Sequence, residues 1–134
     1  MEEKYEVMCN IKGNSANAVI ITNERGGKAQ INFMTEGYDM SAEGENFFYA
    51  LIELRKELEL QDIKLLCKGC SRNVYPSPMI LSMGDAIKAY KLTMGKRAFT
   101  KDLVSIFEPC ELDEYASIEE QYAYYEEWSM CKKT

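Results

Sequence analysis

The first third of the chain alternates apolar and polar residues, which is the pattern of β-strands with one buried face. Segment 5–11 reads YEVMCNI and segment 29–33 reads AQINF, and both alternate along their length. Between them, segment 18–22 (AVIIT) is apolar and β-branched, which is typical of a central strand. Turns that contain Gly and Asn separate the three segments. The pattern therefore predicts an antiparallel meander over the first part of the chain.

A helical spacing of apolar residues follows the meander, with charged residues between them. The apolar positions are Phe47, Phe48, Leu51, Leu54 and Leu58. We expect an amphipathic helix from about residue 42 to residue 59. Ser41 is its expected N-cap, and Glu43 and Glu45 would lie near its positively charged end.

The middle of the chain predicts two more strands around a loop. Apolar alternation over residues 63–67 predicts a fourth strand, and residues 86–94 predict a fifth with weaker alternation. The segment between them, residues 69–84, holds two of the three prolines and reads as an ordered loop. A short helical turn is expected after Pro78 because proline is favoured in the first turn of a helix.

The last part of the chain leaves two points open. Residues 101–107 fit either a short strand or a helical turn, and the last helix starts at Asp113 or at Ser117 and runs to about Cys131. We expect residues 1–134 to form a single domain of the α+β class. A mostly antiparallel β-sheet of about five strands would carry two main helices packed on it.

Charge and composition narrow the classes of partner. The net charge of -6 and the low pI, near 4.8, argue against direct nucleic-acid binding, which needs clustered Lys and Arg. No apolar run is long enough to span a bilayer, so no membrane partner is expected. The acidic N-terminal residues do not resemble a signal peptide, and five irregularly spaced cysteines suggest reduced thiols. We therefore expect a cytoplasmic protein.

The absence of histidine constrains the chemistry more than any motif present. It removes the commonest general base and the commonest metal ligand. Cys67 and Cys70 have the spacing of half a zinc site or of a redox pair, but no second Cys-x-x-Cys exists. We interpret Cys67 as a core residue and Cys70 as an incidental loop thiol. No catalytic residues, metal or cofactor are expected, so the chain is not expected to be an enzyme.

The most informative segment is residues 102–131, which carries nine acids and no Lys or Arg, with aromatic residues among the acids. Such a surface suits a positively charged protein partner, because acids attract it and rings give it a surface to pack on. The expected contact residues are Glu111, Asp113, Glu114, Glu119, Glu120, Tyr122, Tyr125, Glu126, Glu127 and Trp128. The adjacent carboxylate pairs also fit an ordinary solvated helix face.

A basic stretch precedes this acidic segment. It comprises Lys88, Lys91, Lys96, Arg97 and Lys101, with Tyr90 and Phe99 beside them. RNA binding is one interpretation, but the net charge disfavours it. We interpret the stretch as balancing surface charge.

The second half of the chain resembles a known family. The stretch 69–79 reads GCSRNVYPSPM, and it is followed by Met83-Gly84, by KAYKL at 88–92 and by DLVSIF at 102–107. These pieces resemble a widespread family of small bacterial proteins associated with immunity in contact-dependent growth inhibition and related polymorphic toxin systems. The similarity covers residues 62–109 well and the N-terminal half only in general layout.

The resemblance implies an antitoxin-like protein that covers the active site or substrate groove of a toxin delivered by a neighbouring cell. Toxins of such systems are often nucleases, including tRNA-cleaving ones, with basic substrate grooves. The expected partner is therefore the C-terminal domain of a cognate toxin. Arg72, Asn73 and Tyr75 form a possible secondary interface.

Two other functions remain open. A small enzyme or ligand-binding protein would use the polar loop Ser71–Met79, where an Arg and hydroxyl groups suit an anionic substrate. The polar side chains concerned are Ser71, Arg72, Asn73, Tyr75 and Ser77. The third possibility is a regulatory or scaffold module.

Overall fold

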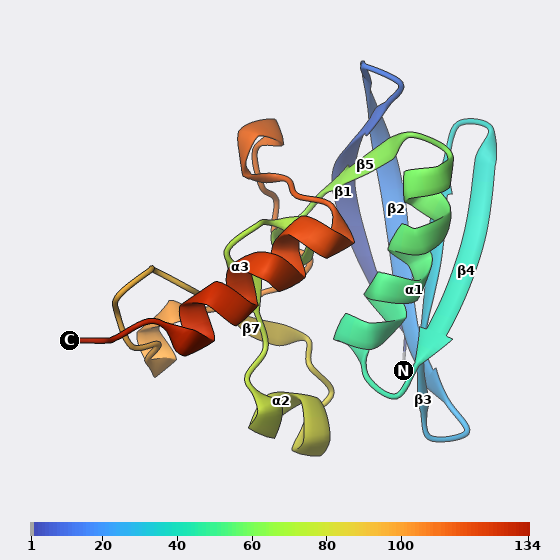
Figure 1. The fold of residues 1–134 in the computed structure, drawn as a ribbon. Helices are drawn as coiled ribbons and strands as arrows, with labels where there is room; N and C mark the ends of the chain where they lie inside the picture. The colour runs from blue at the N-terminus through green and yellow to red at the C-terminus, as the bar shows by residue number, and fades with distance from the viewer. Residues whose placement is uncertain (1) are drawn as a thin grey trace.

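A five-stranded antiparallel sheet forms the N-terminal half of the protein (Figure 1). The computed structural model describes residues 2–134. The strands are β1 (Glu3–Ile11), β2 (Asn14–Arg25), β3 (Lys28–Thr35), β4 (Tyr38–Gly44) and β5 (Ile63–Leu66). Their order in the sheet is β4-β3-β2-β1-β5, so the predicted meander is confirmed and extended by one strand.

The main helix α1 (Phe47–Leu60) covers one face of this sheet and begins later than the sequence predicts. Its N-cap is Asn46, whose side-chain oxygen accepts a 2.9 Å hydrogen bond from the Tyr49 amide. The expected cap Ser41 lies instead in β4, opposite Asn32. The prediction was wrong because residues 38–44 alternate in burial as a strand does, and a turn at Gly37 with φ of 81° folds them back onto β3.

The two acids expected at the start of that helix also lie elsewhere. Glu43 is an exposed residue of β4, and its side chain accepts a hydrogen bond from Gln30 on β3. Glu45 forms a 3.4 Å ion pair with Lys28 across the same edge of the sheet. Neither is in the first turn of α1, where the structure has no acidic residue.

A second, smaller sheet lies in the C-terminal half. It contains β6 (Val74–Tyr75), β7 (Lys88–Lys91) and β8 (Leu103–Ser105) in the order β6-β7-β8. The predicted strand 86–94 is therefore shorter than expected. In the segment 101–107, both alternatives occur in succession, because the 3₁₀ helix η2 (Thr100–Asp102) leads directly into β8.

Two helices and two further 3₁₀ turns complete the fold of the described residues. The 3₁₀ turns are η1 (Lys68–Cys70) and η3 (Leu112–Glu114). The short α2 (Pro78–Met83) confirms the helical turn expected after Pro78. The last helix, α3 (Ile118–Met130), starts after Ser117, whose hydroxyl accepts from the Glu120 amide in a capping box.

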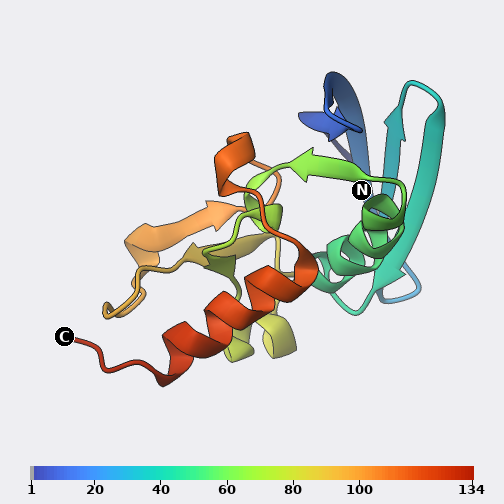
Figure 2. The ribbon, with the colours of Figure 1, turned by 45° about the horizontal axis from the view of Figure 1, so that its top comes forward.

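The helices are placed differently in the two halves of the protein. α1 packs on the five-stranded sheet, whereas α3 contacts β6 and α1. Figures 1 and 2 show α3 beside the small sheet and away from β3 and β4. The α+β class and the mostly antiparallel sheet are thus confirmed.

A buried arginine joins these parts. Arg55 of α1 is only 1% exposed, and among residues 2–134 it has no carboxylate within ion-pairing distance. Its guanidinium donates instead to the Gln121 side-chain oxygen at 2.6 Å and to the Ala116 carbonyl at 2.7 Å. Burying a charge without such partners is strongly unfavourable, so these bonds hold α1 and the start of α3 together.

The amide of Gln121 extends this network to the chain before β6. Its nitrogen donates to the carbonyl oxygens of Gly69, Ser71 and Val74, at 2.8, 2.9 and 2.9 Å. The same Gly69 carbonyl also accepts a 3.3 Å bond from Arg55. One buried glutamine therefore links α1, α3 and residues 69–74.

We expect Gln121→Leu to lower the free energy of unfolding by about 3–5 kcal/mol, because the Arg55 charge and three carbonyls lose their partner. Urea unfolding measures this loss. Gln30→Leu on the half-buried surface of β3 is the control, expected to stay within about 0.5 kcal/mol. Equal effects of the two changes would contradict a special role for the network.

Candidate binding site

Helix α3 places its acids and its rings on different faces. Gln121, Tyr125 and Trp128 recur at helical spacing and point toward the rest of the protein, where Gln121 is buried and the two rings are half-buried. Glu119 and Glu126, seven residues apart, are exposed in one row away from that face, and Glu120 and Glu127 form a second exposed row. Helix α3 therefore has an inward face with Gln121, Tyr125 and Trp128, and a separate exposed surface with the glutamates.

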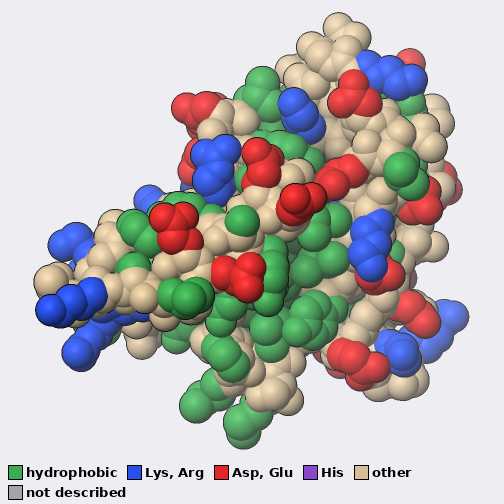
Figure 3. Space-filling model, viewed as in Figure 1, with side chains coloured by type: hydrophobic (Ala, Val, Ile, Leu, Met, Phe, Trp, Pro, Cys, Tyr) green, Lys and Arg blue, Asp and Glu red, His purple; other side chains and the backbone are tan. Residues whose placement is uncertain are grey.

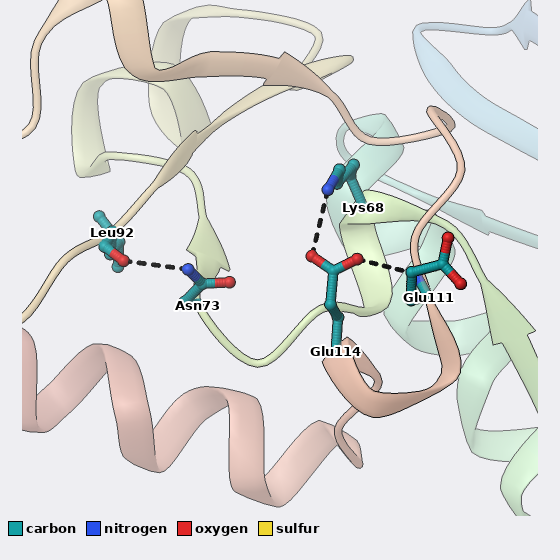
Figure 4. A network of polar contacts seen from close by, with 5 residues as sticks. All are labelled: Lys68, Asn73, Leu92, Glu111 and Glu114. Atoms are coloured by element: carbon teal, nitrogen blue, oxygen red, sulfur yellow. Dashed lines mark hydrogen bonds and ion pairs between the residues drawn. The ribbon is translucent and has the colours of Figure 1, made fainter.

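Several of the predicted contact acids also serve the local structure. Glu114 forms a 3.2 Å ion pair with Lys68 and accepts a 2.8 Å bond from the Glu111 amide (Figure 4). The Glu111 amide and then the Lys68 ammonium hold the pKa of Glu114 below its usual value. Glu120 accepts from the Ser117 amide at 2.9 Å, which likewise lowers its pKa. Glu111 and Asp113 are exposed on η3 and its flank.

Trp128 is fixed against the loop that follows β7. Its indole nitrogen donates to the carbonyls of Thr93 at 3.1 Å and Lys96 at 2.9 Å. The Lys133 ammonium lies 4.3 Å from the centre of the indole ring. Trp128 therefore faces a basic loop of its own chain, on the side of α3 opposite the exposed row of Glu119 and Glu126.

Two other aromatic residues of α3, Tyr122 and Tyr125, join Tyr49 and Tyr75 in a group that we name the tyrosine cluster. Tyr75 stacks on Tyr125 with ring centres 4.2 Å apart and lies 6.0 Å from Tyr122. Burial, and after it the neighbouring tyrosines with Tyr49 first, raises the pKa of Tyr75 to about 12. The cluster thus joins α1, β6 and α3.

The outer part of this cluster is open to solvent. Tyr49 is 40% exposed and Tyr122 is 48% exposed, while Met79 and Met83 of the adjacent α2 are 70% and 82% exposed. Figure 3 shows hydrophobic side chains gathered on the face formed by α1, α2 and α3, with acidic side chains along α3. Exposed aromatic and Met side chains that gather on one face are typical of interaction surfaces.

The polar loop Ser71–Met79 does not form one open site. Ser71 is fully buried, whereas Arg72 is exposed and lines a different hollow from Tyr75 and Ser77. Asn73 donates its side-chain amide to the Leu92 carbonyl at 3.2 Å (Figure 4). Ser77 caps α2 by accepting a 3.1 Å bond from the Ile80 amide. Two of the loop's five polar side chains, Asn73 and Ser77, therefore hold backbone groups.

The Cys-x-x-Cys pair is part of the core. Cys67 and Cys70 are both fully buried, with their sulfur atoms 3.8 Å apart. The interpretation of Cys70 as an incidental loop thiol was wrong, because η1 turns it inward beside Cys67. Hydrogen bonding to Cys70 and burial raise the pKa of the Cys67 thiol. Among residues 2–134, no group of three or more His, Cys, Asp or Glu is placed to hold a metal ion.

No helix in the described part of the chain combines the length and the apolar character needed to cross a membrane. Comparison with protein-family models finds no match to this chain, and no curated protein matches it either.

Two features of the site were missed in the sequence. Tyr49 follows two buried phenylalanines, yet helical spacing rotates it to the solvent side, and an aromatic residue on the polar side of a helix is the signal that could have identified it. The contribution of Met79 and Met83 depends on where α2 lies relative to α1 and α3. That placement arises from long-range packing, which no local pattern reports.

Burial raises the pKa values of both Tyr75 and Tyr115 to about 12, from an ordinary value of 10. Between pH 10 and pH 12 the unfolded chain has lost phenol protons that the folded protein keeps, so stability falls as pH rises through this window. Tyr75→Phe and Tyr115→Phe should each lose less stability over the same window, as measured by urea unfolding. If the free energy of unfolding falls equally with pH in the wild type and in both variants, the raised pKa values are contradicted.

Proposed function

We propose that this chain is an immunity protein that binds and neutralises a cognate toxin of contact-dependent growth inhibition or a related polymorphic toxin system. The observation that carries the proposal is the exposed tyrosine cluster with Met79 and Met83, bordered by the acids of α3. The toxin class comes from the resemblance of residues 62–109 to the immunity family. The surface supports the binding role on physical grounds.

The tyrosine cluster suits a tight protein contact. Tyrosine buries a large apolar area and keeps a hydroxyl for hydrogen bonding, and such residues carry much of the binding energy in interfaces. Tyr75 and Tyr125 are already stacked, so the base of the surface loses little freedom when a partner docks. Tyr49, Tyr122 and the two methionines provide the exposed outer part.

Charge supports a basic partner. Helical spacing places Tyr122 between the inward face of α3 and the row of Glu119 and Glu126, so the apolar surface has carboxylates at its edge. Residues 102–131 hold no Lys or Arg to neutralise them. A nuclease toxin with a cationic substrate groove would be drawn to this edge and would bury its apolar residues on the tyrosines.

Expression of a toxin domain encoded beside this chain tests the role directly. Growth should stop when the toxin domain is expressed alone and recover when this chain is expressed with it, and the two should purify together. A toxin domain that neither binds this chain nor is neutralised by it would overturn the proposal. In that case a small enzyme, a ligand-binding protein or a regulatory module would remain.

We expect Tyr122→Ala to weaken toxin binding by about 2 kcal/mol, near 30-fold in Kd, if its ring is a central contact. Tyr49→Ala should act in the same direction, since the two side chains border the same surface. Isothermal titration calorimetry gives both values. Phe99→Ala is the matched control, because Phe99 is 55% exposed and lies outside the cluster. An equal loss for Phe99→Ala would place the interface elsewhere.

Replacing both Glu119 and Glu126 with Gln should slow association about tenfold at low salt and flatten its salt dependence, with a smaller effect on dissociation. Stopped-flow mixing at several salt concentrations measures both rates. The control pair is Glu24→Gln with Glu36→Gln, which removes the same charge from the exposed end of β2 and from the exposed turn after β3. If both pairs slow association equally, overall charge and not the α3 edge attracts the toxin.

A further inference from the structure

A hollow of about 320 Å³ lies between the small sheet and the C-terminal half of α3. We name it the aromatic–basic pocket, after the aromatic and basic residues among those that line it: Tyr75, Tyr90, Arg97, Tyr125, Trp128 and Lys133. We propose that this pocket binds a small planar anion, a flat ring that carries a phosphate or carboxylate group. This ligand is distinct from the basic protein that the tyrosine cluster would contact.

The walls of the pocket are aromatic rings. Tyr125 is stacked on Tyr75 with 19° between the ring planes, and the Tyr125 and Trp128 planes differ by 25° at a centre distance of 6.4 Å. Tyr90 of β7 is the cross-strand partner of Tyr75 of β6, so their side chains lie on the same side of the small sheet. Nearly parallel rings on one wall favour a flat ligand that stacks on them.

Two cationic side chains, Arg97 and Lys133, also line the pocket. Among the ion pairs of residues 2–134, none involves Arg97 or Lys133. The Lys133 ammonium donates to the carbonyls of Trp128 at 2.7 Å and Cys131 at 3.2 Å, which leaves one of its three protons for a ligand. The guanidinium of Arg97 can meet a phosphate or carboxylate with two parallel hydrogen bonds. An anionic group therefore has partners from two segments.

The surrounding charge is also positive. Residues 86–101 contain five Lys and Arg and no Asp or Glu, and Lys132 and Lys133 follow α3. Hydrogen bonds bring the two segments together: the Thr134 amide donates to the Gly95 carbonyl at 3.0 Å, and the Gly95 amide donates to the Cys131 sulfur at 3.3 Å. Figure 3 shows Lys and Arg side chains gathered around the C-terminal end.

The basic stretch therefore does more than offset acids elsewhere. The three ion pairs in the described part of the chain use Lys28, Lys56 and Lys68, none of which belongs to it. Arg97 of this stretch lines the pocket beside rings that are already held in place, because the Trp128 indole is bonded to the Thr93 and Lys96 carbonyls. A rigid, positively charged aromatic wall loses little freedom on binding an anion.

The protein contains a single tryptophan, so Trp128 fluorescence reports on this pocket. The probes are AMP and 4-hydroxybenzoate, which combine a ring with an anion, and adenosine and inorganic phosphate, which each supply one part. Fluorescence is excited at the red edge of the tryptophan band and corrected for ligand absorption. At least one combined probe should bind with a Kd below about 1 mM and about tenfold more tightly than the single-part probes.

Variants locate the site. Arg97→Gln and Lys133→Gln should each weaken binding of the combined probe by about tenfold, and Tyr90→Leu should weaken it through loss of stacking. Lys56→Gln removes the same charge from an exposed position of α1 outside the pocket, and it should leave binding unchanged. Far-ultraviolet circular dichroism checks that each variant is folded.

Three results would overturn the proposal. One is no change in Trp128 fluorescence, and no heat of binding, with either combined probe at millimolar concentration. Another is phosphate binding as tightly as AMP, which would leave the rings without a role. The third is equal weakening by Lys56→Gln and Arg97→Gln. Arg97 lines the pocket but is not part of the tyrosine cluster, so growth rescue from a toxin by Arg97→Gln separates loss of anion binding from the proposed immunity function.

Discussion

The structure depends on how one buried positive charge is accommodated. Arg55 lies inside the protein and forms no ion pair with any carboxylate of residues 2–134. Backbone carbonyls and the Gln121 side chain take the place of water around it. Burial of an ion is tolerated only where hydrogen bonds compensate it. The carbonyls of Gly69 and Ala116 must therefore stay where they are, which fixes η1 and the entry to α3 relative to α1.

This constraint positions both candidate sites. With Gln121 anchored, helical spacing turns Tyr125 and Trp128 toward the small sheet and leaves the glutamates of α3 in solvent. Tyr125 then stacks on Tyr75, and the rings continue on one side into the tyrosine cluster and on the other into the aromatic–basic pocket. Two surfaces of opposite charge thus share a single aromatic layer.

The local pattern of apolar residues was sufficient to predict much of the fold. Alternation identified the strands of the meander, and the spacing of Phe47 to Leu58 identified α1, because these signals come from residues close in sequence. The predicted start of α1 was wrong. Ser41 followed by Glu43 and Glu45 resembles a helix N-terminus, but this segment pairs with β3 as an edge strand. The composition of residues 102–131 revealed acids and rings but not their separation by α3. The approach of Lys133 to the loop after β7 depends on contacts between distant segments, which periodicity does not encode.

The distance along the chain between Arg55 and Gln121 has a consequence for how the protein folds. The strands β1 to β4 are joined by short turns and can pair early, whereas the bond between these two side chains spans 66 positions. During synthesis the guanidinium stays hydrated until the segment that contains Gln121 has emerged and can pack on it. Its transfer from water into the interior is therefore a late step, which couples completion of the last helix to closure of the core.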